Sequence, residues 1–148
     1  MDSDLPLSTT LEVYNRCLCF AAHRAARALA RRFDAALAPF GISHGQYSLM
    51  ISLNRPDPPR LGEAADFLGM DRTTLTANLK PLERMGLVSI VPDKEDRRSR
   101  RLVLTDAGRA VLKAAVPVWR ATHDEVDGAV SGDGGALRTQ LRHIASVA

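Results

Sequence analysis

The densest group of chemically active side chains is the charged run from Lys94 to Arg101, in which five of the eight residues are basic. Lysine and arginine neutralise nucleic-acid phosphates, and an arginine on a loop tip can enter the negative potential of a narrow minor groove. An isolated run of charges is more often only a solvated surface. The elements on either side therefore decide its interpretation.

A second group of polar side chains shares one face of a predicted helix. Leu75, Leu79 and Leu82 follow one another at i, i+4 and i+7, which predicts a buried stripe. Short side chains, hydroxyls and cations suit a DNA major groove, because they allow close approach and reach base edges and phosphates. The opposite face carries such residues, namely Arg72, Thr73, Thr76, Ala77, Lys80 and Arg84.

Other patterns argue against catalysis. The segment 41–45 matches the G-x-S-x-G nucleophile elbow, but an elbow follows a strand, whereas this segment follows a predicted helix and a proline. Ser43 also forms a capping box with Gln46. The phosphate-binding G-x-x-x-x-G-K and metal-binding H-E-x-x-H patterns are missing from the sequence. We therefore expect no enzyme activity, no catalytic residue, no cofactor and no metal.

The composition is that of an ordinary folded chain. It has 148 residues, of which 45% are hydrophobic, and a net charge of +3, which weakly favours polyanionic partners. No apolar run reaches 18 residues, and the first residues are acidic where a signal peptide is basic. We expect a cytoplasmic protein that has no membrane contact.

Caps and glycines predict the elements that position these groups. A capping box at residues 9–12 predicts a helix of about 30 residues that ends near Pro39 and spans roughly 45 Å. Three helices follow, which begin at Ser43, at Leu61 and, with Asp71 as cap, near residue 72. The last two are separated only by the short turn around Gly69, which is helix-turn-helix spacing.

After Gly86 the pattern changes to two short β-branched stretches, 87–91 and 101–104, joined by the basic tip. Thr105 caps a long helix that Pro117 should kink, and residues 131–135 separate it from a last helix. The predicted fold is mainly α with a small β-hairpin wing (α+β): a winged helix-turn-helix lobe at 43–105 within a single chain, 1–148. The helical regions 9–40 and 106–147 are expected to mediate dimerisation.

This arrangement resembles the MarR family of winged-helix regulators. The resemblance implies a cytoplasmic homodimer that binds a pseudo-palindromic operator in double-stranded DNA and regulates transcription, with repression favoured over activation. The residues that match in order and spacing are Thr74-Leu75-Thr76, Leu82-Glu83, Gly86-Leu87-Val88, Asp96-Arg97-Arg98, Thr105 and Gly108.

The resemblance also assigns DNA contacts. Arg98 would enter the minor groove from the wing, with Arg97 as a further contact. Ala77 departs from the family, which more often has a larger or polar residue there, and Pro81 interrupts the reading helix. The residues that would contact bases or phosphates from the helix are Arg72, Thr73, Thr76 and Lys80.

The signal that such a regulator would sense has two alternatives. The segment 18–21 resembles the organic-hydroperoxide-sensing branch, in which a cysteine at the position of Cys19 is oxidised, and Arg16 and His23 flank it at helical spacing. That branch places tyrosines where this chain has His23 and Phe33, and a cysteine that packs as a small hydrophobe is an equal alternative. Cys17 would face another side of the helix and could not bond to Cys19.

The second alternative is a small aromatic or anionic effector, bound between the dimerisation helices and the DNA-binding lobe. Its candidate pocket residues are His23, His44, Tyr47 and Trp119, although aromatic residues at helical spacing usually pack. A rival function for the whole chain is a winged-helix module whose basic face binds an acidic protein partner.

Overall fold

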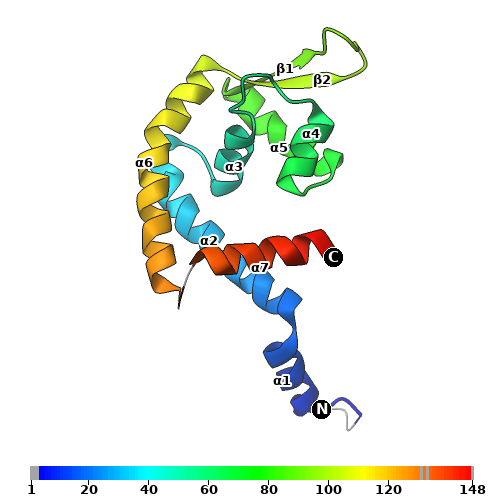
Figure 1. Cartoon of the computed structure of the whole chain (residues 1–148), viewed down its shortest axis with the longest axis vertical. Helices are drawn as coiled ribbons and strands as arrows, with labels where there is room; N and C mark the ends of the chain where they lie inside the picture. Colours follow the sequence, from blue (N-terminus) through cyan, green and yellow to red (C-terminus); the bar gives the residue numbers. More distant parts are fainter. Residues whose placement is uncertain (1–3, 131, 133, 148) are drawn as a thin grey trace.

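A computed structural model describes residues 4–130, 132 and 134–147. Helices α2, α6 and α7 form the long arms of the molecule, and a lobe built from α3, α4, α5 and a β-hairpin is attached to them (Figure 1). The fold is mainly helical with one two-stranded antiparallel sheet, as the sequence predicted. The elements are α1 Leu7–Arg16, α2 Leu18–Leu37, η1 Ala38–Phe40, α3 His44–Ser52, α4 Leu61–Leu68, α5 Arg72–Arg84, β1 Val88–Pro92, β2 Arg100–Leu104, α6 Asp106–Ala129 and α7 Gly134–Val147.

The first predicted helix is two helices, so the prediction of one continuous helix was wrong. Cys17 has extended backbone angles (φ −77°, ψ 105°), and its thiol accepts a hydrogen bond from the Phe20 amide. It thereby caps α2 and ends α1. The predicted capping box at 9–12 is also wrong, because α1 begins after Pro6 and Glu12 forms an ion pair with Arg16 instead.

The helices of the helix-turn-helix begin at the capping residues that the sequence indicated. Ser43 and Gln46 make the capping box of α3, and the Asp71 carboxylate accepts from the Thr74 amide at the start of α5. Gly69 between α4 and α5 has a left-handed backbone (φ 65°), which glycine adopts without steric cost. The three leucines of α5 are fully buried. The helix continues past Pro81 to Arg84.

The hairpin pairs Val88 with Leu104 and Pro92 with Arg100. The junction with α6 is tight, because Thr105 caps that helix through the Gly108 amide and donates its hydroxyl to the Gly86 carbonyl. A Cβ atom on Gly108 would lie 2.2 Å from the Leu87 carbonyl oxygen. Helix α6 continues through Pro117 to Ala129.

The core lies inside the lobe. Leucines of α3, α5 and β2 and Val88 of β1 pack there with Leu112 and Ala115 of α6, which fixes the lobe to the long arm. Ser131 and Asp133, part of the predicted break before the last helix, lie outside the described residues. Gly134 and Gly135 were assigned to the same break, but they begin α7.

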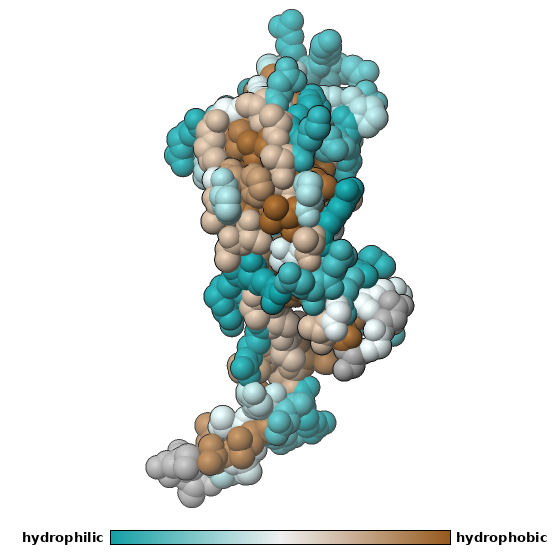
Figure 2. Space-filling model, turned by 90° about the vertical axis from the view of Figure 1, so that its left-hand side faces the viewer, coloured by the Kyte–Doolittle hydropathy of each residue, from teal (hydrophilic) through white to brown (hydrophobic). Residues whose placement is uncertain are grey.

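The helices outside the lobe expose apolar surface. Helix α1 projects away from the body in Figure 1 and buries none of its residues. Figure 2 shows a further apolar surface over α6. Within the described part of the chain, no helix is long and apolar enough to cross a membrane.

We expect Gly108→Ala to destabilise the fold by about 1–3 kcal/mol, the usual cost of overpacking a close contact. The added methyl group would overlap the Leu87 carbonyl oxygen and lie 2.8 Å from Leu104 Cδ1. Urea unfolding followed by circular dichroism measures the change. Gly45→Ala is the control, because its Cβ would meet only Ser43 Oγ, at 3.9 Å. Equal stability of the two variants would contradict the tight junction.

Candidate nucleic-acid interface

The outer face of α5 is exposed as the sequence predicted. Arg72, Thr73, Thr76 and Lys80 all lie on the surface. The Thr76 hydroxyl donates to the Arg72 carbonyl oxygen at 2.7 Å. Its proton is therefore used, and its lone pairs remain available to accept a hydrogen bond from a base amino group.

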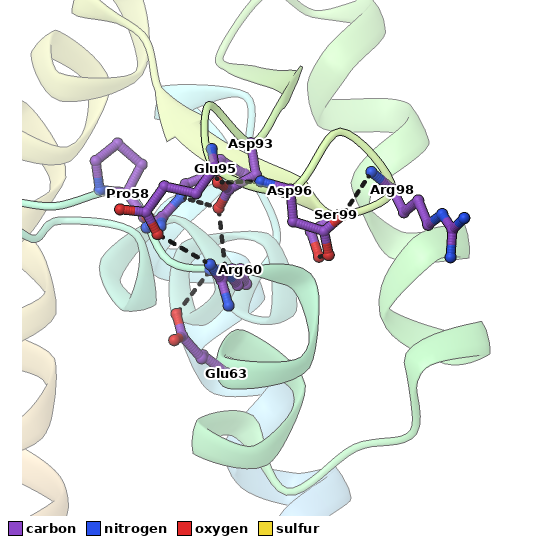
Figure 3. A network of polar contacts seen from close by, with 9 residues as sticks. Pro58, Arg60, Glu63, Asp93, Glu95, Asp96, Arg98 and Ser99 are labelled. Atoms are coloured by element: carbon purple, nitrogen blue, oxygen red, sulfur yellow. Dashed lines mark hydrogen bonds and ion pairs between the residues drawn. The ribbon is translucent and has the colours of Figure 1, made fainter.

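The wing tip is a loop folded around two aspartates. Asp93 Oδ1 accepts the amides of Glu95 (2.7 Å) and Asp96 (3.2 Å). Asp96 in turn accepts the Arg98 amide at 3.0 Å and the Ser99 hydroxyl at 3.1 Å. Asp96 therefore holds the loop through the Arg98 backbone and the Ser99 side chain, and not through an arginine side chain. The Arg98 side chain points away from this network (Figure 3).

A buried carboxylate ties the wing to α4. The Asp93 side chain is only 1% exposed, and its Oδ2 accepts from Arg60 Nε at 3.0 Å and from Arg101 Nε at 2.6 Å. Arg60 precedes α4, and Arg101 also donates to the Pro58 carbonyl oxygen. Figure 3 shows Arg60 beneath the wing loop, between Asp93 and Glu63. The wing is therefore fixed at its base and free at its tip.

The electrostatics agree with this geometry. The hydrogen bond from the Glu95 amide, followed by the one from Arg60, holds the pKa of the Asp93 carboxyl far below its usual range. The hydrogen bond to Asp93 likewise raises the pKa of the Arg60 guanidinium. Both groups are therefore charged at neutral pH.

Two features of this site were not predicted. Arg101 was counted among the basic tip residues, yet it lies in β2 and its guanidinium turns inward to Asp93. Arg60 and Asp93 were not singled out, because a lone arginine after prolines and an aspartate in a charged run carry no periodic signal. The pairing of Arg60 with Asp93 becomes visible only in the three-dimensional structure.

The candidate pocket residues divide into two groups. Tyr47 of α3 stacks on Trp119 of α6, with ring centroids 5.9 Å apart, and burial raises the pKa of the Tyr47 hydroxyl. His44 joins the same aromatic cluster through Phe33, whereas His23 is exposed on α2 and makes no ring contact among the described residues. The cluster thus joins α2, α3 and α6, and it contains Phe33 and His123, which the sequence did not indicate as pocket residues.

A cavity of about 330 Å³ adjoins this cluster and is lined by Trp119, His123, two arginines and two aspartates, namely Arg120, Arg138, Asp124 and Asp127. Arg138 of α7 donates to Asp127 of α6 at 2.7 Å, and this hydrogen bond lowers the pKa of the Asp127 carboxyl. None of His23, His44 and Tyr47 lines the cavity. Of the four predicted pocket residues, only Trp119 lines this cavity.

The cysteines lie at the junction of α1 and α2. Cys19 is exposed and Cys17 is half-buried, and neither cysteine is in a disulfide. The expected helical neighbours of Cys19 are only partly present, because Arg16 belongs to α1 and pairs with Glu12. The prediction that Cys17 and Cys19 share one helix was also wrong, because Cys17 lies outside α2.

A helix-turn-helix with a basic wing defines a winged-helix DNA-binding protein, and comparisons specify it further. The family model described as MarR family matches residues 42–99. The transcriptional activatory protein BadR of Rhodopseudomonas palustris is 33% identical over 130 residues, which cover 85% of this chain and 74% of the relative. The organic hydroperoxide resistance transcriptional regulator of Bacillus subtilis is 28% identical over 101 residues, or 68% of this chain and 69% of that one.

A solved structure is also similar over almost the whole chain. The M. tuberculosis transcriptional regulator MosR in complex with DNA superposes with a TM-score of 0.83 at 36% identity, covering 89% of this chain and 96% of MosR. This chain belongs to the MarR family of winged-helix, DNA-binding transcriptional regulators. The family and its matched members are regulators of transcription and not enzymes.

We expect Asp93→Asn to weaken the acid dependence of stability. The pKa of Asp93 is depressed in the fold, so its contribution is fully present above the ordinary aspartate pKa of about 4 and is lost as pH falls toward the folded value. The variant should be less stable than wild type at neutral pH, and it should lose less stability on acidification. Urea midpoints between about pH 7 and pH 3 measure both effects.

Some acid dependence should remain, because the pKa values of Asp71 and Asp127 are also lowered. Asp124→Asn, at an exposed position of α6, is the matched control and should follow the wild-type curve. A variant curve parallel to wild type would show that Asp93 does not carry the effect.

Proposed function

We propose that this regulator binds a pseudo-palindromic operator as a homodimer and represses transcription until a signal lowers its DNA affinity. The observation that carries the DNA-binding part is that the start of α5 and the wing tip line one hollow, to which Arg72 and Arg98 both contribute. A reading helix and a wing arginine on one side can engage a major groove and the adjacent minor groove together.

The roles of the contact residues follow from their chemistry. Thr73 and Thr76 offer short hydroxyl side chains to base edges, and Lys80 supplies a cation to the backbone. Arg98 enters the minor groove, and Arg97 adds a second cation at the tip.

The homodimer is supported by unburied apolar stripes on the terminal helices. Leu137, Leu141 and Ile144 follow one face of α7 and are between 44% and 49% exposed. Leu7, Leu11 and Tyr14 form a similar stripe on α1. Contiguous apolar faces of this kind are normally covered, and a second copy would place two reading helices on one duplex.

Repression requires only that a bound dimer occupies promoter DNA, so it needs no surface beyond those described. The BadR relative is described as an activatory protein. Repression is therefore the part of the proposal that a reporter assay with the chain's own promoter would test directly.

We expect Arg98→Ala to weaken operator binding by roughly tenfold or more, in line with the loss of a charge-assisted contact. A gel-shift titration measures affinity on an operator selected from a randomised duplex pool, with random duplex as competitor. Lys113→Ala, on α6, removes one positive charge elsewhere and should bind as wild type does. Sedimentation should find both variants dimeric.

Unchanged affinity of Arg98→Ala would refute the wing contact. A wild-type protein that did not distinguish selected from random duplex would refute sequence-specific regulation and would favour the protein-interaction module. A wild-type monomer in sedimentation would refute the homodimer.

Two inputs are proposed for the signal, one at each end of α2. Cys19 is exposed next to the break at Cys17, where its oxidation would alter the α1 and α2 surfaces. The Trp119 cavity lies beside an aromatic cluster that joins α3 of the lobe to α6, and Arg120, which is in no ion pair among the described residues, would attract an aromatic anion. Either change would act on the spacing of the two reading helices.

A DNA-release assay separates these inputs. If Cys19 senses oxidation, organic hydroperoxide should release wild type from DNA but leave Cys19→Ser bound. If the cavity senses an effector, a panel of aromatic acids should release wild type, and release should need several-fold more acid with Trp119→Leu. Peroxide release that persists in Cys19→Ser eliminates the thiol sensor, and acid release unchanged in Trp119→Leu eliminates the cavity.

A further inference from the structure

Gly62, the second residue of α4, is a glycine whose backbone does not require glycine. It lies within a regular helix and has no left-handed φ, so its conformation is open to any residue. The space that a side chain would need is filled. A Cβ atom there would lie 2.7 Å from Nη2, 3.3 Å from Cζ and 3.4 Å from Nε of Arg72. The missing Cβ is what makes room for this guanidinium.

Arg72 reaches this position because it is the first residue of α5. Side chains of a helix lean toward its N-terminus, which here points back to α4 and the wing. Arg72 is exposed, as are Thr76 and Lys80 further along α5. Its guanidinium nevertheless lies against Gly62 of the neighbouring helix α4.

The hollow beside Gly62 has a volume of about 430 Å³ and an excess of positive charge. Arg72, Arg98 and Arg100 line it, and among the described residues none of their guanidinium groups is held in an ion pair or side-chain hydrogen bond. Glu63 and Asp66 also line it, and Glu63 accepts the Arg60 amide. Arg60, the fourth cation, is already paired with Asp93.

We infer that Gly62 is a seat for the Arg72 guanidinium, and that the seated arginine binds a phosphate of the DNA backbone and not a base. The inference rests on the proposed DNA contact and refines the role of Arg72 within it. A guanidinium presents a planar fork that matches phosphate oxygens, and a fork held against helix α4 loses less conformational freedom on binding. Gly62 is then a positioning residue that acts through Arg72.

A phosphate contact and a base contact leave different signatures. Phosphate contacts are independent of sequence and release counterions, so each adds to the salt dependence of binding. We expect Arg72→Ala to weaken the selected operator and random duplex by a similar factor, and to reduce the slope of log affinity against log salt by about 1. Loss of preference at one operator position with an unchanged slope would overturn the inference.

The role of Gly62 is tested by a double-mutant cycle. Gly62→Ala should weaken DNA binding about tenfold, the order of one charge-assisted hydrogen bond, because its methyl group displaces the guanidinium. In the Arg72→Ala background the same substitution should have no effect, since nothing is left to displace. Equal losses in both backgrounds, or no loss in either, would overturn the seat.

The control is Gly45→Ala, which makes the same substitution at the second residue of α3, where the added Cβ has ordinary space. Circular dichroism should show every variant folded, because alanine is favoured over glycine in helices. The cycle can be measured on random duplex as well as on the operator. If the protein does not prefer the operator over random duplex, the proposed sequence-specific regulation is refuted. The cycle on random duplex still tests whether Gly62 positions Arg72 for a phosphate.

Discussion

The Asp93 carboxylate is the interaction on which the geometry of the DNA-binding lobe depends. A two-stranded hairpin is marginally stable by itself, and this one carries a tip of repelling cations. Asp93 binds loop amides with one oxygen and two arginines, Arg60 and Arg101, with the other. Its burial would be costly for a lone charge, and the paired arginines offset that cost. The wing base is thereby joined to the start of α4.

This arrangement separates positioning from binding among similar side chains. Arg60 and Arg101 are consumed by Asp93, so they hold the wing in place. Arg97 and Arg98 directly follow Asp96, whose amide binds the same aspartate, yet they remain exposed at the tip. The arginines at and near the wing therefore have different roles, and the role of each depends on whether its guanidinium can reach the Asp93 carboxylate.

The long helices impose a second constraint, because they must connect the lobe to the apolar stripes of α1 and α7 in one chain. Leu112 and Ala115 of α6 pack into the lobe core, while the stripes of α1 and α7 remain uncovered. The aromatic cluster of Tyr47 and Trp119 lies between these regions. Any change that moves α6 relative to α3 would be passed to the reading helix, since packed elements shift as units.

The sequence by itself determined the elements whose signals are local: the caps at Ser43, Asp71 and Thr105, the glycine turns, and the leucine stripe of α5. These depend on neighbours within a few residues, so spacing reveals them. Tertiary structure alone decided the pairing of Asp93 with Arg60 and the seat that Gly62 gives Arg72. Those contacts join residues up to 33 positions apart or depend on a missing side chain, and no periodicity records either.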